Sequence, residues 1–140
     1  MRARAWLAVV AALIATFPSG ALPKRRAVSS VIRVCLPMSS DNLFLSYLGE
    51  VSGGNPASGM PVAIGEQVDF SVLPRGYSFF CDAHTVTWNF SDGSQPVTTF
   101  PQSPVHHTFT SNGTFVVTAV VRNSSQQYVL GTIVFVAVPS

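Results

Sequence analysis

From residue 43 onward the chain alternates between short apolar stretches and clusters of turn-forming residues. In residues 66–72 every second side chain is apolar and those between are polar, which is typical of a half-buried strand. The same alternation places Val86, Trp88 and Phe90 on one face of residues 85–90. We predict strands over five stretches, which are residues 43–51, 66–72, 85–90, 114–122 and 132–138.

Turn signals separate these stretches. Residues 53–61 are rich in Gly and Pro, Asp92-Gly93-Ser94 indicates a reversal, and residues 123–126 fit a hairpin turn. The apolar residues 31–36 form one more short candidate strand. Beyond the first 21 residues, no segment has convincing helical periodicity. About seven short strands with turns between them predict an all-β chain with an immunoglobulin-like β-sandwich fold.

The last two predicted strands carry more apolar residues than one buried face needs. In residues 114–122 alternate positions from Phe115 to Val121 point inward, which leaves Val116 and Val120 on the other face. Both faces of residues 132–138 are apolar. A shared apolar outer face is rare on a soluble monomer unless it binds something. We expect an interaction or self-association patch that includes Val116, Val120, Val134 and Val136. The alternative is that residues 31–36 fold back over it.

The first residues have the features of a secretory signal peptide. Arg2 and Arg4 precede an apolar stretch, residues 5–17, and Pro18 and Gly20 follow it. This stretch is too short to span about 30 Å of hydrocarbon, which needs about 20 residues. We predict a signal peptide over residues 1–21, an extension over 22–42 and the sandwich domain over 43–140. The mature chain is therefore expected to be secreted or extracytoplasmic, without a stable membrane span.

Composition excludes several classes of protein. Charged residues make up 10% and hydrophobic residues 47% of the chain, so intrinsic disorder is not expected. Six of the eight Lys and Arg residues precede Val34, and from there on only Arg75 and Arg122 oppose six carboxylates. That part carries a net charge of −4, which repels phosphate backbones and argues against nucleic-acid binding.

The only two cysteines are Cys35 and Cys81. An exported chain meets an oxidising compartment, where such a pair commonly forms a disulfide. The bond would close a loop of about 46 residues. Two separately buried thiols are the alternative, because free cysteine packs as a small hydrophobe.

Two motifs resemble the polycystic kidney disease (PKD) domain family. Residues 88–94 read W-N-F-S-D-G-S and are similar to the family's W-D-F-G-D-G-S, and residues 107–123 begin H-T-F and continue G-T-F-V-V-T-A-V-V-R-N. The resemblance implies an extracellular β-sandwich module, usually non-catalytic, that serves adhesion or binding. It also implies structural roles for Trp88, Phe90, Asp92, Gly93, His107, Phe109, Gly113, Phe115 and Val117.

The chain departs from the family pattern in its polar positions. Asn89 and Ser91 stand where the pattern has Asp and Gly, and Phe109 and Phe115 replace tyrosines. We expect the fold to tolerate these changes, while contacts that depend on the family's polar groups are not carried over to this chain.

Catalytic chemistry is weakly represented. The six acids are scattered, and no nucleophile or phosphate-loop motif is present, so we predict that the protein is not an enzyme and binds no cofactor. Asp82 and the histidines His84, His106 and His107 lack zinc-ligand spacing. A calcium ion at Asp92 is an alternative to a simple capped turn.

An aromatic cluster, Tyr77, Phe79 and Phe80, precedes Cys81. Exposed rings of this kind stack on sugars, whereas buried ones attach a loop to the sandwich. The first functional hypothesis is therefore a secreted, non-catalytic protein-interaction or adhesion module. The alternative is a carbohydrate-binding module that uses this loop, with a polysaccharide in place of a protein partner.

Overall fold

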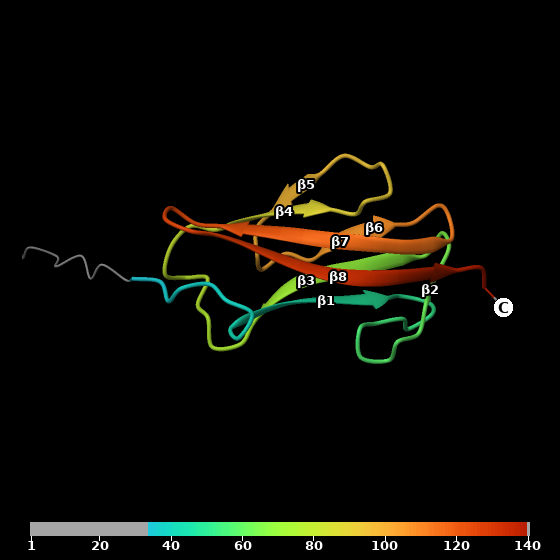
Figure 1. Ribbon diagram of the computed structural model, residues 1–140, viewed down its shortest axis with the longest axis horizontal. Helices are drawn as coiled ribbons and strands as arrows, with labels where there is room; N and C mark the ends of the chain where they lie inside the picture. Colours follow the sequence, from blue (N-terminus) through green and yellow to red (C-terminus); the bar gives the residue numbers. More distant parts are fainter. Residues whose placement is uncertain (1–33, 140) are drawn as a thin grey trace, which may run out of the picture. The chain divides into compact units, whose positions relative to one another are not determined.

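The computed structural model describes residues 34–139, which form a sandwich of two β-sheets (Figure 1). The described residues contain eight strands and no helix, so the all-β prediction is confirmed. The strands are β1 (Leu43–Gly49), β2 (Val62–Ala63), β3 (Gln67–Pro74), β4 (Thr85–Asn89), β5 (Val97–Thr99), β6 (Val105–Thr108), β7 (Gly113–Arg122) and β8 (Gln127–Ala137). The predicted signal peptide, residues 1–21, lies outside the described residues.

One sheet has the strand order β1-β3-β6, and the other has the order β2-β8-β7-β4-β5. All pairs are antiparallel except β2 with β8. The longest ladder joins β7 to β8, which lie side by side as the hairpin at the red end of the colour scale in Figure 1. Its turn is closed by the Asn123 N–H, which donates to the carbonyl of Gln126 at 3.0 Å. The predicted hairpin turn at residues 123–126 is therefore confirmed.

The five strongly patterned strands are present as β1, β3, β4, β7 and β8. The last of them begins at Gln127, five residues before the predicted start, because Gly131 interrupts the apolar pattern without breaking the ladder. The predicted strand over residues 31–36 is wrong in its described part. Val34 and Leu36 pair with no strand and are 84% and 61% exposed. An apolar run forms a strand only where a neighbour satisfies its backbone groups.

Aromatic rings from both sheets meet around Phe70 on β3. Its ring centroid lies 5.3 Å from Phe90, 5.7 Å from Tyr47, 6.2 Å from Trp88 and 6.4 Å from Phe109. Trp88 on β4 is 1% exposed, as the motif implied, and its indole N–H donates to Thr99 Oγ1 at 3.0 Å. This hydrogen bond replaces the one that the indole N–H would make to water, and so offsets the cost of burying it.

A buried carboxylate holds the long β1–β2 loop against the start of β3. Glu66 accepts hydrogen bonds from the backbone N–H groups of Val51, Ser52 and Ala63 and from the Ser52 hydroxyl. Burial by itself raises the pKa of Glu66, but these hydrogen bonds outweigh it and hold the net pKa below the usual value. Glu66 therefore holds the residues on either side of the turn-rich loop, residues 53–61, and backbone hydrogen bonds between Gly49 and Gly53 and between Gly49 and Gly54 hold its start.

Replacing Phe70 by alanine tests the importance of this aromatic core. Phe70 is fully buried, so Phe70→Ala removes its contacts with the facing sheet and leaves a cavity. We expect the free energy of unfolding to fall by about 3–5 kcal/mol in urea denaturation. The control, Phe100→Ala, removes a ring that is 68% exposed and should change stability by less than about 0.5 kcal/mol. Equal effects of the two substitutions would contradict this account of the core.

Candidate functional site

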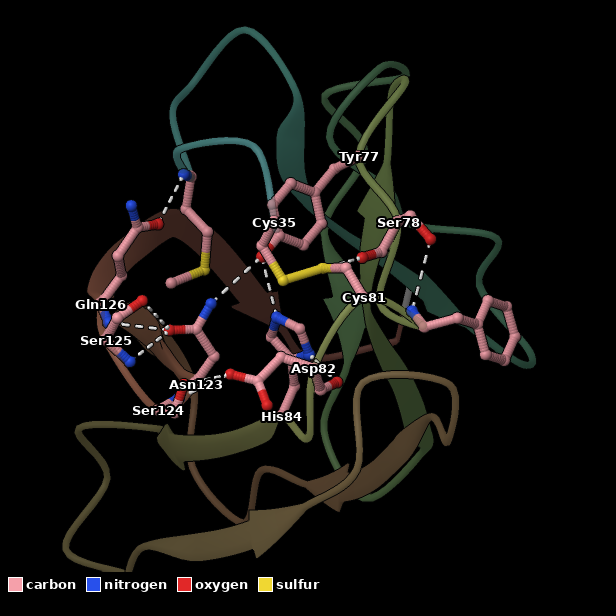
Figure 2. Close-up of a disulfide and its surroundings, with 12 residues drawn as sticks. Cys35, Tyr77, Ser78, Cys81, Asp82, His84, Asn123, Ser124, Ser125 and Gln126 are labelled. Atoms are coloured by element: carbon pink, nitrogen blue, oxygen red, sulfur yellow. Dashed lines mark hydrogen bonds between the residues drawn. A yellow bond between two sulfur atoms is a disulfide. The ribbon is translucent and has the colours of Figure 1, made fainter. Parts of the chain in front are cut away.

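A disulfide joins Cys35 to Cys81, with 5.2 Å between their Cα atoms, so the predicted bond is present (Figure 2). It ties the coil before β1 to the loop between β3 and β4. The coil is also held by Met38, whose N–H donates to Gln126 Oε1 at 3.1 Å. The segment before β1, the β3–β4 loop and the β7–β8 turn therefore meet at one end of the sandwich. We call this group the disulfide cluster.

Polar side chains beside the disulfide form a continuous hydrogen-bond network (Figure 2). The buried His84 places Nδ1 2.8 Å from the carbonyl oxygen of Asp82 and Nε2 2.8 Å from the Tyr77 hydroxyl. The carbonyl accepts only, so Nδ1 carries the proton and Nε2 accepts from Tyr77. The Tyr77 oxygen lies 3.5 Å from the amide nitrogen of Asn123. Burial raises the pKa of Tyr77, which keeps its hydroxyl protonated as a donor.

The Asp82 carboxylate binds the β7–β8 turn. Its Oδ2 accepts from the backbone N–H of Ser124 at 3.0 Å and from the Ser124 hydroxyl. The hydroxyl and then the backbone N–H of Ser124 lower the pKa of Asp82. The carboxylate is therefore committed to holding the turn.

This cluster brings an Asp, a His and a Ser together, but not in a catalytic arrangement. The carboxylate contacts Ser124, while His84 contacts Tyr77 and a backbone carbonyl. Within the described residues His84 has no hydrogen bond to Ser124, so this geometry does not give the serine a general base. Cys35, Cys81 and His84 place possible metal-ligand atoms within 4.8 Å of one another. However, sulfurs bonded to each other are not thiolates, and the thiolate is the form that binds metal.

The three histidines lie in separate surroundings. His106 is exposed on β6, where its Nδ1 is 2.5 Å from Asp69 Oδ1. His107 is turned the other way and pairs with Asp92. The nominal grouping of all three histidines with Asp82 is therefore not assembled.

The family motifs meet at the reversal after β4. Asp92 Oδ1 accepts from the N–H of Ser94 at 3.0 Å and from its hydroxyl at 2.6 Å, while Oδ2 lies 2.7 Å from His107 Nε2. The His107 ring stacks on Phe90, with 3.8 Å between centroids. Burial by itself raises the pKa of Asp92, but the hydrogen bonds from Ser94 and His107 outweigh this effect and lower the pKa to about 2. Both carboxylate oxygens are used within the chain, which is the capped-turn arrangement.

The two departures beside Trp88 have local explanations. Ser91 stands where the family pattern has Gly and adopts a positive φ of 56°, which is costly for a residue with a Cβ. Its hydroxyl donates to the carbonyl of Val116 at 2.7 Å, and Asn89 Oδ1 accepts from the Ser91 N–H at 2.9 Å. Gly93 has a φ of 90°, which glycine adopts at little cost.

The remaining motif residues pack inside or against the core. Phe90, Phe109 and Val117 are at most 1% exposed, and the ring of half-buried Phe115 lies 4.7 Å from that of Phe109. Gly113 begins β7. Phe109 and Phe115, which stand where the family pattern has tyrosines, therefore contact each other through their apolar rings.

The outer face of β7 and β8 is apolar, but not through all of the predicted residues. Val134 and Val136 are 0% and 5% exposed, so placing them on the patch was wrong. Because successive strand residues point to opposite faces, burying them turns their odd-numbered neighbours outward. The exposed or half-exposed apolar residues of this β7–β8 face are Val116, Val120, Val129, Ile133 and Phe135.

The aromatic loop is mostly buried, so the proposed three-ring sugar platform is not formed. Tyr77 and Phe79 are 5% and 7% exposed, and their rings pack edge-on against His84. Only Phe80 is exposed, at 80%. Both rings pack against His84 in the disulfide cluster, a tertiary contact that residue type alone does not reveal.

Two facing sheets and a motif-bearing turn define an immunoglobulin-like β-sandwich module. The family profile of the PKD domain matches residues 55–128, and the chain therefore belongs to the PKD domain family. Its structure is similar to the solution structure of the PKD domain from the human VPS10 domain-containing receptor SorCS2. The TM-score is 0.57 and the identity 18%, over 93% of this chain and 98% of that one. No curated protein matches significantly. Among the described residues no helix has the length and apolar character to cross a membrane.

Removing the disulfide should lower stability substantially. The bond spans a sequence separation of 46 residues, and closing a loop of that size is worth about 4 kcal/mol in the chain-entropy model. We expect Cys35→Ser combined with Cys81→Ser to lose about that much in urea denaturation. A thiol reductant should destabilise the wild type and leave the double variant unchanged. An unaltered urea midpoint in the double variant would argue against a stabilising bond.

Asp92 should make stability depend on pH in the acid range. Its pKa is about 2 in the folded protein against 3.8 for the free side chain, so its contribution is complete above pH 3.8. That contribution, about 2 kcal/mol, is lost as the pH falls towards 2. Asp92→Asn should remove the Asp92 part of the acid-range dependence in thermal unfolding measured from pH 6 to pH 2, while the part due to Glu66 and Asp82 stays. The exposed Asp41→Asn is the control, and an identical pH profile for both variants would refute the assignment.

Proposed function

We propose that the chain is an exported, non-catalytic PKD module that binds another protein through its β7–β8 face. PKD domains are generally non-catalytic extracellular interaction modules, and the disulfide fits an oxidising compartment. Residues 1–21 would direct export and be removed, residues 22–42 would form the extension, and residues 43–140 would form the module.

The observation that carries this proposal is the contiguity of the β7–β8 face. Val116 lies directly opposite Ile133, and Val120 lies opposite Val129, so their side chains adjoin across the ladder. Val116, Val129, Ile133 and Phe135 are each 50–54% exposed. Exposing an apolar patch to water on two central strands of a sheet is unfavourable in free energy, and such patches commonly mark interaction sites, which supports a binding role.

Two alternatives are less well supported. Val34 and Leu36 are themselves exposed, so these residues of the extension do not cover an apolar face. Carbohydrate binding loses its platform because Tyr77 and Phe79 are buried. Self-association through the β7–β8 face is a form of the same proposal, with a second copy as the partner.

A pair of cross-strand substitutions tests the proposal. Val116→Thr with Ile133→Thr keeps β-branched side chains on the strands but makes the centre of the face polar. We expect the double variant to lose partner capture from the extracellular fraction of the native source, or self-association in analytical ultracentrifugation. Its thermal stability should change little because both positions are half-exposed.

Leu48→Thr is the matched control, since Leu48 is also 53% exposed but lies on β1 in the other sheet. It should retain the association of the wild type. Equal association by wild type, double variant and control would remove the β7–β8 face from consideration.

A further inference from the structure

Beyond Phe70, β3 has no strand partner among the described residues on the edge away from β1, and this part of β3 lines a groove. In an antiparallel ladder, residues alternate between pairs that exchange hydrogen bonds and pairs that do not. At the two ends of the β1–β3 ladder, the backbone N–H of Arg75 donates to the carbonyl of Asn42 at 2.7 Å, and the backbone N–H of Glu50 donates to the carbonyl of Gln67 at 3.1 Å. The odd-numbered residues of β3 therefore exchange backbone hydrogen bonds with β1. Val72 is even-numbered, so its N–H and C=O point to the opposite edge of β3.

On that edge the neighbouring strand stops too early to reach Val72. β6 pairs with β3 only as far as Val105, which lies opposite Phe70. Ser103 would be the next hydrogen-bonding residue in this register, facing Val72. Its N–H instead donates to the carbonyl of Phe100 at 3.1 Å, so the chain turns away before the pair can form.

Val72 is consequently an unusual residue. It is 2% exposed, yet among the described residues neither its N–H nor its C=O has a hydrogen-bond partner. More than nine in ten buried backbone groups in folded proteins pair with protein or with ordered water, so these two groups need a partner from outside the chain. The free N–H and C=O of one strand residue can pair with the C=O and N–H of a second extended peptide that lies beside the strand.

The space beside Val72 is an apolar groove of about 370 Å³. Its walls are the end of β3, the Tyr77–Phe80 loop, and Pro101 with Gln102. None of its ten lining residues is charged. This volume lies at the lower end of the range for ligand pockets, which is about 300–1,000 Å³.

We propose that this β3 groove binds an uncharged, extended peptide strand of a partner protein. One residue of the strand would exchange two backbone hydrogen bonds with Val72. Because residues opposite each other in a ladder point to the same face, its side chain would enter the groove on the side of Tyr77 and Phe79. The site lies on the three-stranded sheet, away from the β7–β8 face, and does not depend on the function proposed for that face.

The test uses a blocked peptide and the full mature chain labelled with ¹⁵N. The probe is acetyl-Ser-Val-Ser-methylamide, whose central valine supplies the two backbone groups and an apolar side chain. We expect its titration to shift the Val72 amide resonance saturably at millimolar peptide and to slow hydrogen exchange there. The same peptide with N-methylvaline lacks the donor and should bind about tenfold more weakly.

Two protein variants locate the binding site. Phe80→Ala removes an 80% exposed wall of the groove without touching the core and should weaken binding about fivefold. Phe100→Ala removes an exposed ring that does not line the groove and should leave binding unchanged. The proposal is overturned if Val72 shows no saturable shift or if the N-methylated peptide binds equally well. It is also overturned if cellobiose produces the same shifts, since the site would then recognise hydroxyls rather than a peptide.

Discussion

The packing of one ring, Phe70, between the two sheets is the contact on which the other features depend. It contacts Tyr47 on its own sheet and Trp88 on the facing sheet. It also contacts Phe90, whose ring stacks on His107 of β6, and His107 pairs with Asp92 in the reversal after β4. Because these residues come from strands far apart in the chain, burying Phe70 fixes the relation of the sheets. The polar capping network around Asp92 is attached to this core through the stacking of His107 on Phe90.

Strand parity determines most of what the surface displays. Once Val117, Ala119 and Val121 pack inward, Val116 and Val120 must point outward, and the antiparallel register sets Ile133 and Val129 opposite them. The apolar outer face is thus tied to the way the core is filled. It costs solubility, and this is the physical reason for assigning it a binding role.

The sequence was informative wherever a pattern was long and locally consistent. The alternation around Phe70 and Trp88 predicted β3 and β4, and the family motifs placed Trp88 in the core. Val134 and Val136 were assigned to the wrong face because both parities of β8 are apolar, so periodicity cannot choose between them.

Other features had no local signal. β2, β5 and β6 are two to four residues long and exist because neighbouring strands supply partners. The burial of Glu66 depends on N–H groups more than ten residues away, from a loop that looked like an ordinary surface turn. Tyr77 and Phe79 are buried against His84, a tertiary arrangement that aromatic residue type does not encode.

The disulfide also has a mechanical consequence. A pull on the segment before Cys35 passes across the sulfur bridge to Cys81. β1, β2 and β3 lie inside the bridged loop, so tension along the chain passes from Cys35 directly to Cys81 and on into the residues that follow, which begin with β4. While the bridge is intact, residues 36–80 therefore add no length to a stretched chain.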